Sequence, residues 1–267
     1  MRTSALWIGV LAGGAGCTTD GAPPAQPVGR LELRQAIGVA DASPIGVAVT
    51  PDGVRYVMDE SRGLYQIEGE TAVAVMPMSA LPTPDVPIKL PITDLVAISR
   101  GVFALTAIGD GYILDTAAQT LTQKFCYVPD GTPSYLTQRT DGIAYDPDRD
   151  QLYAQPLTFD PEGVLQYSQL AGYLRTTGAA VAWYGVDSSV AAGGMAMIPD
   201  AGLVLGQDTH LDRFDPDTSK TVPWDDLARY GVQSIQGLAI DRTTGSLLVV
   251  DGASDELVEI ALSDLGR

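Results

Sequence analysis

The sequence predicts an all-β protein, a five-bladed β-propeller, from three observations. A phrase of four residues occurs five times, with an alanine in third place and an apolar residue on each side of that alanine. Its alanines are spaced by 49, 47, 52 and 43 residues, a period typical of propeller blades. Apolar runs are short and are broken by Gly or Pro, which disfavours helices. The copies are Gly46-Val47-Ala48-Val49, Leu95-Val96-Ala97-Ile98, Gly142-Ile143-Ala144-Tyr145, Gly194-Met195-Ala196-Met197 and Gly237-Leu238-Ala239-Ile240.

Each copy predicts the first strand of a blade, because a turn and a second apolar strand follow it. Pro51-Asp52-Gly53 and Thr243-Thr244-Gly245 are turn sequences of this kind. First and second strands are apolar on both faces, as expected where blades pack against each other. The second strands are predicted at 55–58, 102–107, 151–154, 203–206 and 247–250. Third strands are predicted at 64–67, 111–114, 164–167, 211–214 and 257–260, and fourth strands at 73–76, 122–127, 179–184 and 220–222.

The two ends of the chain predict how the ring closes. The fifth repeat has only residues 261–267 after its third strand, too few for a good fourth strand. The alternating segment 31–34 precedes the first repeat and is not used by it. We expect this N-terminal strand to complete the last blade, which removes an exposed sheet edge. Six blades are the alternative, if the long stretch 155–190 hides a degenerate blade.

Residues 1–16 have the features of a secretory signal, with Arg2 before a short apolar run and small residues before Cys17. Residues 17–30 are polar and rich in Pro and Gly, which predicts a flexible tether. The domain itself is predicted over 31–267. The signal resembles the lipobox of bacterial lipoproteins, in which Cys17 would be lipidated, although Gly14 stands where Leu is usual. A plain secreted protein is the alternative.

The net charge of −17 disfavours nucleic acid as a partner, since 16 Lys and Arg residues offer no basic surface. The chain also lacks a nucleotide-binding glycine loop and a nucleophile elbow. With one histidine and two cysteines, it cannot form a His- or Cys-rich zinc site.

Polar residues gather at one predicted mouth of the channel. The start of each first strand and the end of each second strand lie on the same face of the ring, where propellers usually bind ligands. Candidate ligand-binding residues there are Asp59, Asp94, Asp141, Asp208, His210, Gln236 and Asp251. Clustered carboxylates suit Ca²⁺, so Asp94, Asp141 and Asp251 are the candidate metal ligands. Aspartate is also a common loop residue, and under that reading no cofactor is expected.

The repeats resemble those of the NHL, YVTN and SMP-30-like propeller superfamily. The segments that carry the resemblance are Gly142-Ile143-Ala144-Tyr145-Asp146-Pro147-Asp148 and Gly237-Leu238-Ala239-Ile240. Within it, SMP-30-like lactonases hold a metal with carboxylates and asparagines. This chain contains no asparagine, so no catalytic residue is carried over.

These observations predict an exported, lipid-anchored propeller of the bacterial cell envelope, in the outer membrane or periplasm or secreted. We expect a non-catalytic binding or scaffold module with a protein or polysaccharide partner. The alternative is a Ca²⁺-dependent hydrolase of lactonase or esterase type with its site in the acidic mouth.

Overall fold

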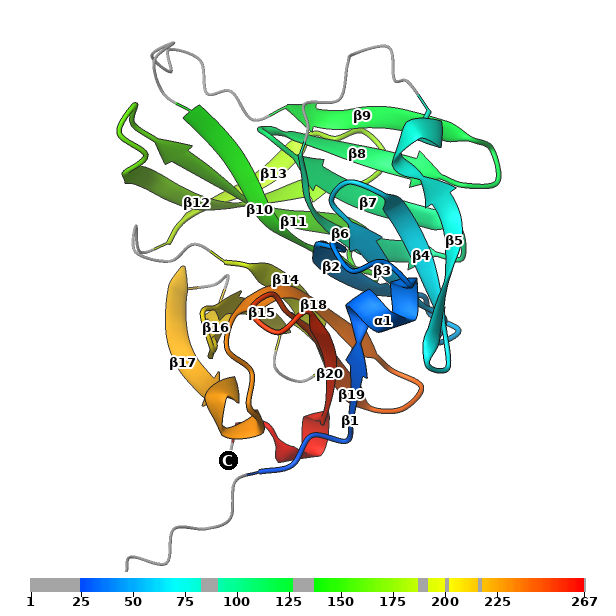
Figure 1. Ribbon diagram of the computed structural model, residues 1–267. Coiled ribbons are helices and arrows are strands. Elements are labelled where there is room, and N and C mark those ends of the chain that lie inside the picture. The colour runs from blue at the N-terminus through cyan, green and yellow to red at the C-terminus, as the bar shows by residue number, and fades with distance from the viewer. Residues whose placement is uncertain are drawn as a thin grey trace, which may run out of the picture.

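The structure is a computed structural model that describes residues 25–82, 91–126, 137–186, 192–199, 202–215 and 218–266. Its strands form five four-stranded antiparallel sheets, the blades of a propeller (Figure 1). Blade I is β2 (Pro44–Val49), β3 (Arg55–Asp59), β4 (Gly63–Glu68) and β5 (Thr71–Pro77). Blade II is β6 (Ile92–Ser99), β7 (Val102–Ala107), β8 (Asp110–Asp115) and β9 (Thr120–Cys126). Blade III is β10 (Thr137–Asp146), β11 (Gln151–Phe159), β12 (Leu165–Leu174) and β13 (Ala180–Gly185). Blade IV is β14 (Gly194–Ile198), β15 (Gly202–Gln207), β16 (His210–Asp215) and β17 (Lys220–Asp226). Blade V is β18 (Ile235–Asp241), β19 (Ser246–Asp251), β20 (Glu256–Ala261) and β1 (Gly29–Glu32).

The first strands of the blades form the wall of the central channel. Each of β2, β6, β10, β14 and β18 contacts the first strand of the next blade, and β18 contacts β2, so the ring is complete. Four short helical segments complete the described structure: α1 (Leu33–Ile37), η1 (Met78–Ala80), η2 (Leu227–Tyr230) and η3 (Leu262–Asp264). No helix among the described residues is long and apolar enough to cross a bilayer.

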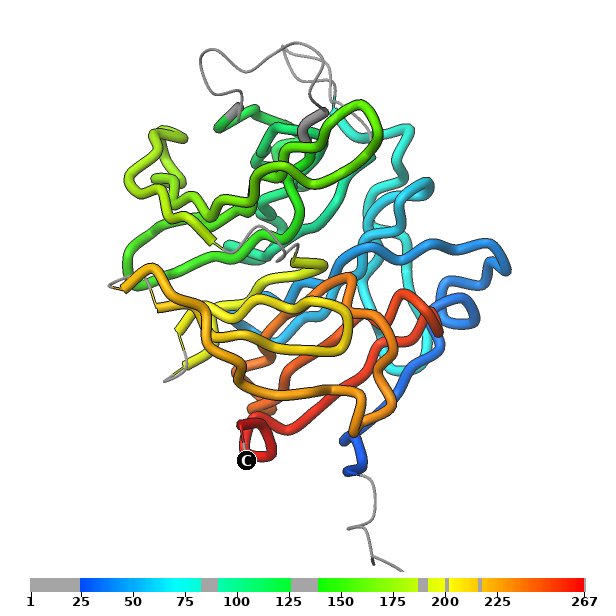
Figure 2. Tube along the Cα trace, turned by 90° about the vertical axis from the view of Figure 1, so that its left-hand side faces the viewer, coloured from blue at the N-terminus to red at the C-terminus, as the bar shows by residue number. Residues whose placement is uncertain are grey.

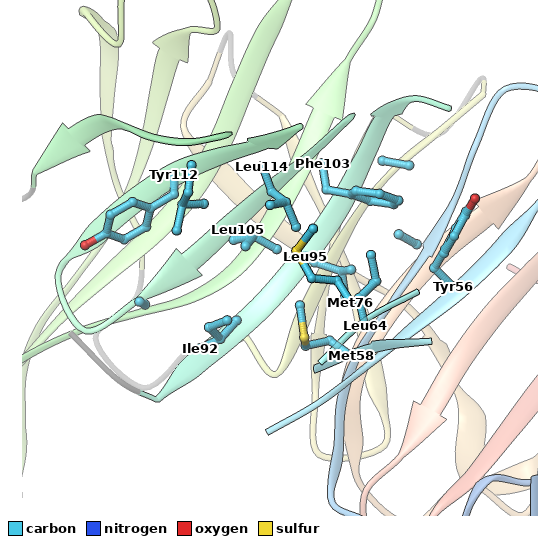
Figure 3. Packing of buried hydrophobic residues seen from close by; sticks show 14 residues of the cluster. Tyr56, Met58, Leu64, Met76, Ile92, Leu95, Phe103, Leu105, Tyr112 and Leu114 are labelled. Carbon is cyan, nitrogen blue, oxygen red and sulfur yellow. The ribbon is translucent and has the colours of Figure 1, made fainter. Parts of the chain in front are cut away.

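Apolar side chains pack between neighbouring blades. Figure 3 shows the cluster between blades I and II, where Met58 and Leu64 meet Leu95 and Phe103. Similar clusters lie between the other pairs of blades, including blades V and I, where Val47 and Val57 meet strands of the last blade. Both faces of a sheet are therefore buried, which explains why the first and second strands are apolar throughout.

Glycines allow the inner strands to approach closely. A Cβ added to Gly237 would lie 2.7 Å from the Cα of Gly46 in the neighbouring blade. A Cβ added to Gly194 would lie 2.7 Å from the backbone nitrogen of Leu238. A real Cβ has no room at such distances, so the small residue that begins these copies of the phrase sets the spacing around the channel.

The N-terminal strand closes the ring, as predicted. β1 pairs antiparallel with β20, from Gly29 opposite Glu259 to Glu32 opposite Glu256. Figure 2 shows the blue N-terminal segment beside the red C-terminal hairpin. The strand lies two residues earlier than predicted, because Leu33 begins α1, where its side chain is fully buried between blades V and I. The tether predicted over 17–30 thus overlaps β1; residues 1–24, with the predicted signal and Cys17, lie outside the described residues.

An ion-pair network joins the last blade to the first. The guanidinium of Arg55 on β3 donates to Asp241 at 2.8 and 3.0 Å and to Glu259 at 2.8 Å. Asp241 is almost fully buried. Although burial opposes it, hydrogen bonds from Thr243 and Arg55 lower the pKa of Asp241. The closure therefore combines a strand ladder, apolar packing and charge pairing.

The six-bladed alternative is wrong. Within the described residues, the stretch 155–190 belongs to blade III, whose strands β10, β11 and β12 have 10, 9 and 10 residues. The extra length extends the hairpin of β11 and β12 instead of adding a sheet. The tip of this hairpin reaches the mouth of the channel, as described below.

Candidate functional site

Asp59 and Asp251 occupy the same place in their blades, at the end of the second strand, and are fully buried. The carboxylate of Asp59 accepts hydrogen bonds from the backbone N–H groups of Ser43 at 2.7 Å, Ser61 at 3.0 Å and Arg62 at 2.9 Å. It thereby ties the loop before the first strand to the turn after the second. Aspartate suits this role because its short side chain accepts several backbone bonds at once.

Asp251 repeats this arrangement in blade V. Its carboxylate accepts the backbone N–H groups of Gln233 at 3.0 Å and Ser234 at 2.9 Å, before the first strand. It also accepts from Ala253 and from the hydroxyl of Ser254 in the following turn. The oxygens of Asp59 and Asp251 thus serve their own loops, which is a structural role at the rim of the mouth.

Asp94 lies in the wall of the channel and is fully buried. One carboxylate oxygen accepts the N–H of Leu95 at 2.8 Å, and the other accepts the N–H of Ile143 in blade III at 3.0 Å. Burial raises the pKa of Asp94 well above its usual range, these backbone bonds counteract the rise, and Asp141 adds to it. Gly46 faces this carboxylate, and a Cβ there would lie 2.6 Å from it. Asp94 joins blades II and III at the axis.

Asp141 and Arg139 form an ion pair at the mouth. Both lie on β10, two residues apart, and the Nε of Arg139 donates to the Asp141 carboxylate. Asp141 is 6% exposed, whereas the side chain of Arg139 is more than half exposed. Burial raises the pKa of Asp141, and Arg139 partly counteracts the rise. The pair offers a donor group and a carboxylate to the channel.

A cavity of about 550 Å³ opens at this mouth. All five blades contribute a residue that lies one or two positions before the repeated phrase in the first strand. These residues are Ile45, Thr93, Asp141, Gly193 and Gln236. The turns after the second strands of blades I and II contribute Glu60 and Ile108, and the long hairpin of blade III contributes Phe159, Asp160, Pro161 and Gly163. The lining is mixed: apolar walls carry separated charged and hydrogen-bonding groups.

The predicted site residues therefore separate into three groups. Asp141 and Gln236 line the cavity, and Asp59, Asp94 and Asp251 lie buried behind it with backbone partners. Asp208 lies in the turn between β15 and β16, and His210 begins β16; both are exposed, and neither lines the cavity. The Nε2 of His210 lies 3.8 Å from the Asp226 carboxylate, and its Nδ1 lies 3.3 Å from the hydroxyl of Thr209.

The structure adds residues that the sequence reasoning missed, above all Arg139 and Thr93. Arg139 was missed because β10 begins at Thr137, five residues before the repeated phrase. Its spacing of two from Asp141, which places both on one face of a strand, is a signal that could have revealed it.

No group of three His, Cys, Asp or Glu side chains that could hold a metal ion occurs in the described ranges. Asp94 and Asp251 direct their oxygens to backbone N–H groups, so the set Asp94, Asp141 and Asp251 is not assembled around an ion. These described residues do not fit Ca²⁺ as they stand, and calcium binding stays a prediction.

Comparison with known proteins identifies a fold. No family model matches the chain, and no curated protein matches its sequence. A solved gluconolactonase from Xanthomonas campestris superposes with a TM-score of 0.51 at 15% identity, covering 83% of this chain and 73% of that one. A luciferin-regenerating enzyme superposes with a TM-score of 0.50 at 14% identity, covering 89% and 75%. At this identity the likeness establishes the propeller fold that the chain has in common with these enzymes.

Proposed function

We propose that this protein is a non-catalytic binding module that takes a small organic molecule, or one end of a larger partner, into the mouth of its channel. The observation that carries the proposal is the cavity of about 550 Å³ to which all five blades contribute. Mixed apolar and polar walls around a concave site of this size are typical of ligand pockets. The described acidic residues behind it are occupied by backbone hydrogen bonds, which favours binding over chemistry.

The test is a fragment screen by saturation-transfer NMR on the wild type and two variants, Arg139→Ala and Phe159→Ala. Both side chains line the mouth, so fragments that bind the wild type are expected to lose affinity for both variants. Arg242→Ala is the control, because Arg242 is exposed at the opposite end of the channel. Equal binding to all four proteins would contradict the proposal.

The second candidate is a Ca²⁺-dependent hydrolase of lactonase or esterase type. It is favoured by the fold likeness to a gluconolactonase and by Asp141, whose raised pKa suits proton transfer at the cavity wall. Hydrolysis of glucono-δ-lactone with CaCl₂ and with EDTA tests it. Turnover above the uncatalysed rate that is lost in Asp141→Asn would favour the enzyme, and its absence in CaCl₂ would oppose it.

We further propose that the module is exported and held at a bacterial membrane by a lipid on Cys17. The support is the sequence of residues 1–17. Metabolic labelling with an alkynyl fatty acid should mark the wild type and leave Cys17→Ser unmarked. Membrane association that persists in Cys17→Ser would oppose the anchor.

A further inference from the structure

We propose that the mouth selects organic cations, molecules that carry primary ammonium groups on an apolar chain. This inference rests on the proposed binding function and names its ligand class. Three side chains that line the cavity are acidic, Glu60, Asp141 and Asp160, and one is basic, Arg139. Arg139 is already paired with Asp141, and the carboxylate of Asp160 accepts hydrogen bonds from the N–H of Val164 and the side-chain amide of Gln166, both at 2.8 Å. Those two donors carry no charge, so the three acids leave the lining with an excess of negative charge over Arg139.

The placement of these acids favours an extended cation over a metal ion. Glu60 follows the second strand of blade I, whereas Asp160 lies at the tip of the long hairpin of blade III. The described residues contain no group of three acids that could hold one ion. Ca²⁺ needs six to eight oxygens at about 2.3–2.6 Å. Acids distributed around a rim instead match a molecule whose positive charges are separated along its length.

The remaining walls suit the body of such a molecule. Ile45 and Ile108 offer aliphatic surface to methylene groups, and Phe159 adds an aromatic ring, a group that attracts ammonium ions. Ser43, Thr93 and Gln236 add oxygen acceptors for N–H donors. The overall charge of −17 draws cations toward the protein and raises their local concentration.

Isothermal titration with spermidine tests the inference, using the full chain. The wild type is expected to bind, and Glu60→Gln and Asp141→Asn are each expected to weaken binding roughly threefold to tenfold at low salt. Arg139→Gln removes a repulsive charge and is expected to tighten binding. Asp148→Asn, an equal charge change at an exposed site on the opposite face, is the matched control and should leave affinity within about twofold.

The sign of the Arg139→Gln effect separates the ligand classes. If Arg139→Gln abolishes binding and Glu60→Gln strengthens it, the mouth selects anions and the inference is wrong. Binding of CaCl₂ that depends on Asp141, without binding of spermidine, would also overturn it. A trilysine peptide in the same titration distinguishes a peptide source of the ammonium groups from a free polyamine.

Failure of this inference differs from failure of the binding function. If spermidine does not bind but neutral fragments still bind in an Arg139- and Phe159-dependent manner, only the charge class is refuted. If neither binds at the mouth, the binding function itself fails. Circular dichroism of each variant confirms that the fold is retained.

Discussion

The two ends of the central channel are built by the same five strands and differ in both size and chemistry. The mouth encloses about 550 Å³ and carries Arg139, Asp141 and Glu60, whereas the cavity at the other end encloses about 170 Å³. The narrow end is lined mostly by apolar residues of the repeated phrase, including Val96, Ile98, Met195, Met197 and Ile240. The repeated part of each strand therefore forms the narrow end, and the residues that vary from blade to blade form the wide one.

The largest effect is expected when the ring is opened, because both ends of the channel depend on the closed ring and should be lost together. Deletion of residues 29–37 removes β1 and α1, with the buried Leu33 and the ladder to β20. We expect a loss of about 4–6 kcal/mol in the free energy of unfolding. Thermal unfolding followed by circular dichroism should show a fall of at least about 10 °C in Tm.

Deletion of residues 18–24 is the matched control, since it shortens the chain without touching β1. A Tm that is unchanged in the 29–37 deletion would refute the closure. An equal fall in both deletions would show that length, and not the strand, matters.

A carboxylate introduced at each end in turn compares how well the two ends of the channel tolerate a charge. Ile45 at the mouth and Ile240 at the narrow end are both partly buried and both pack against a core cluster. Ile240→Asp should cost about 2–4 kcal/mol, because Ile240 packs against the core between blades IV and V in a lining that is mostly apolar, and Arg242 at that end is exposed to solvent. Ile45→Asp should cost less than half of that, since the mouth is polar and open. Urea denaturation measures both, and equal losses would mean that the two ends are equivalent.

The buried carboxyl of Asp94 predicts a pH effect on stability. Its folded pKa is raised, so the folded state binds its proton more tightly than the unfolded state. Stability is therefore greatest below the unfolded pKa and falls as the pH rises toward the folded pKa, by at most about 1.4 kcal/mol per pH unit. Asp94→Asn removes this titration. The variant should be less stable near pH 4, because one backbone N–H loses its acceptor, and the difference should shrink as the pH rises, because the slope of the variant above about pH 4 is shallower.

Urea titrations of both proteins from pH 4 to 8 give the free energy of unfolding as a function of pH. The titration of other groups is common to both proteins, so it cancels in the difference between the two slopes. Parallel curves would show that Asp94 does not titrate differently in the folded state.

The smallest effect is expected at His210, which belongs to the face of the mouth but not to the cavity. Its ring is mostly exposed and lies 3.8 Å from Asp226. His210→Ala should change the free energy of unfolding by less than about 0.5 kcal/mol and leave spermidine binding unaltered. A several-fold loss of binding would extend the site onto the turn between β15 and β16.

The strands and the ring closure could be predicted from the sequence, because the repeated phrase places hydrophobic residues and turns at a fixed period. Which side chain faces the cavity could not. In blade I the residue left out of the strand pairing is Ile45, but in blade II it is Thr93, one residue earlier in the repeat. Side chains alternate along a strand, so this shift puts Thr93 at the cavity and turns Asp94 into the wall.

Arg139 illustrates a second limit. The five copies of the phrase are equally short, and nothing in them shows that β10 continues backward to Thr137. The length of a strand beyond its repeated core depends on what pairs with it, here the extended β11. Asp59 and Asp251 could be placed at the rim by their spacing, but their role depends on loop backbone that the spacing does not describe.

The close approach of Gly46 and Gly237 has a consequence for how a blade could be added to the ring. Another blade would place the inner strands on a wider circle, and glycine has no side chain with which to fill the added gap. A chain lengthened by one copied repeat would thus have to exchange these glycines for larger residues around the axis. In this protein glycine favours a small ring, because the inner strands of blades IV, V and I are already in backbone contact.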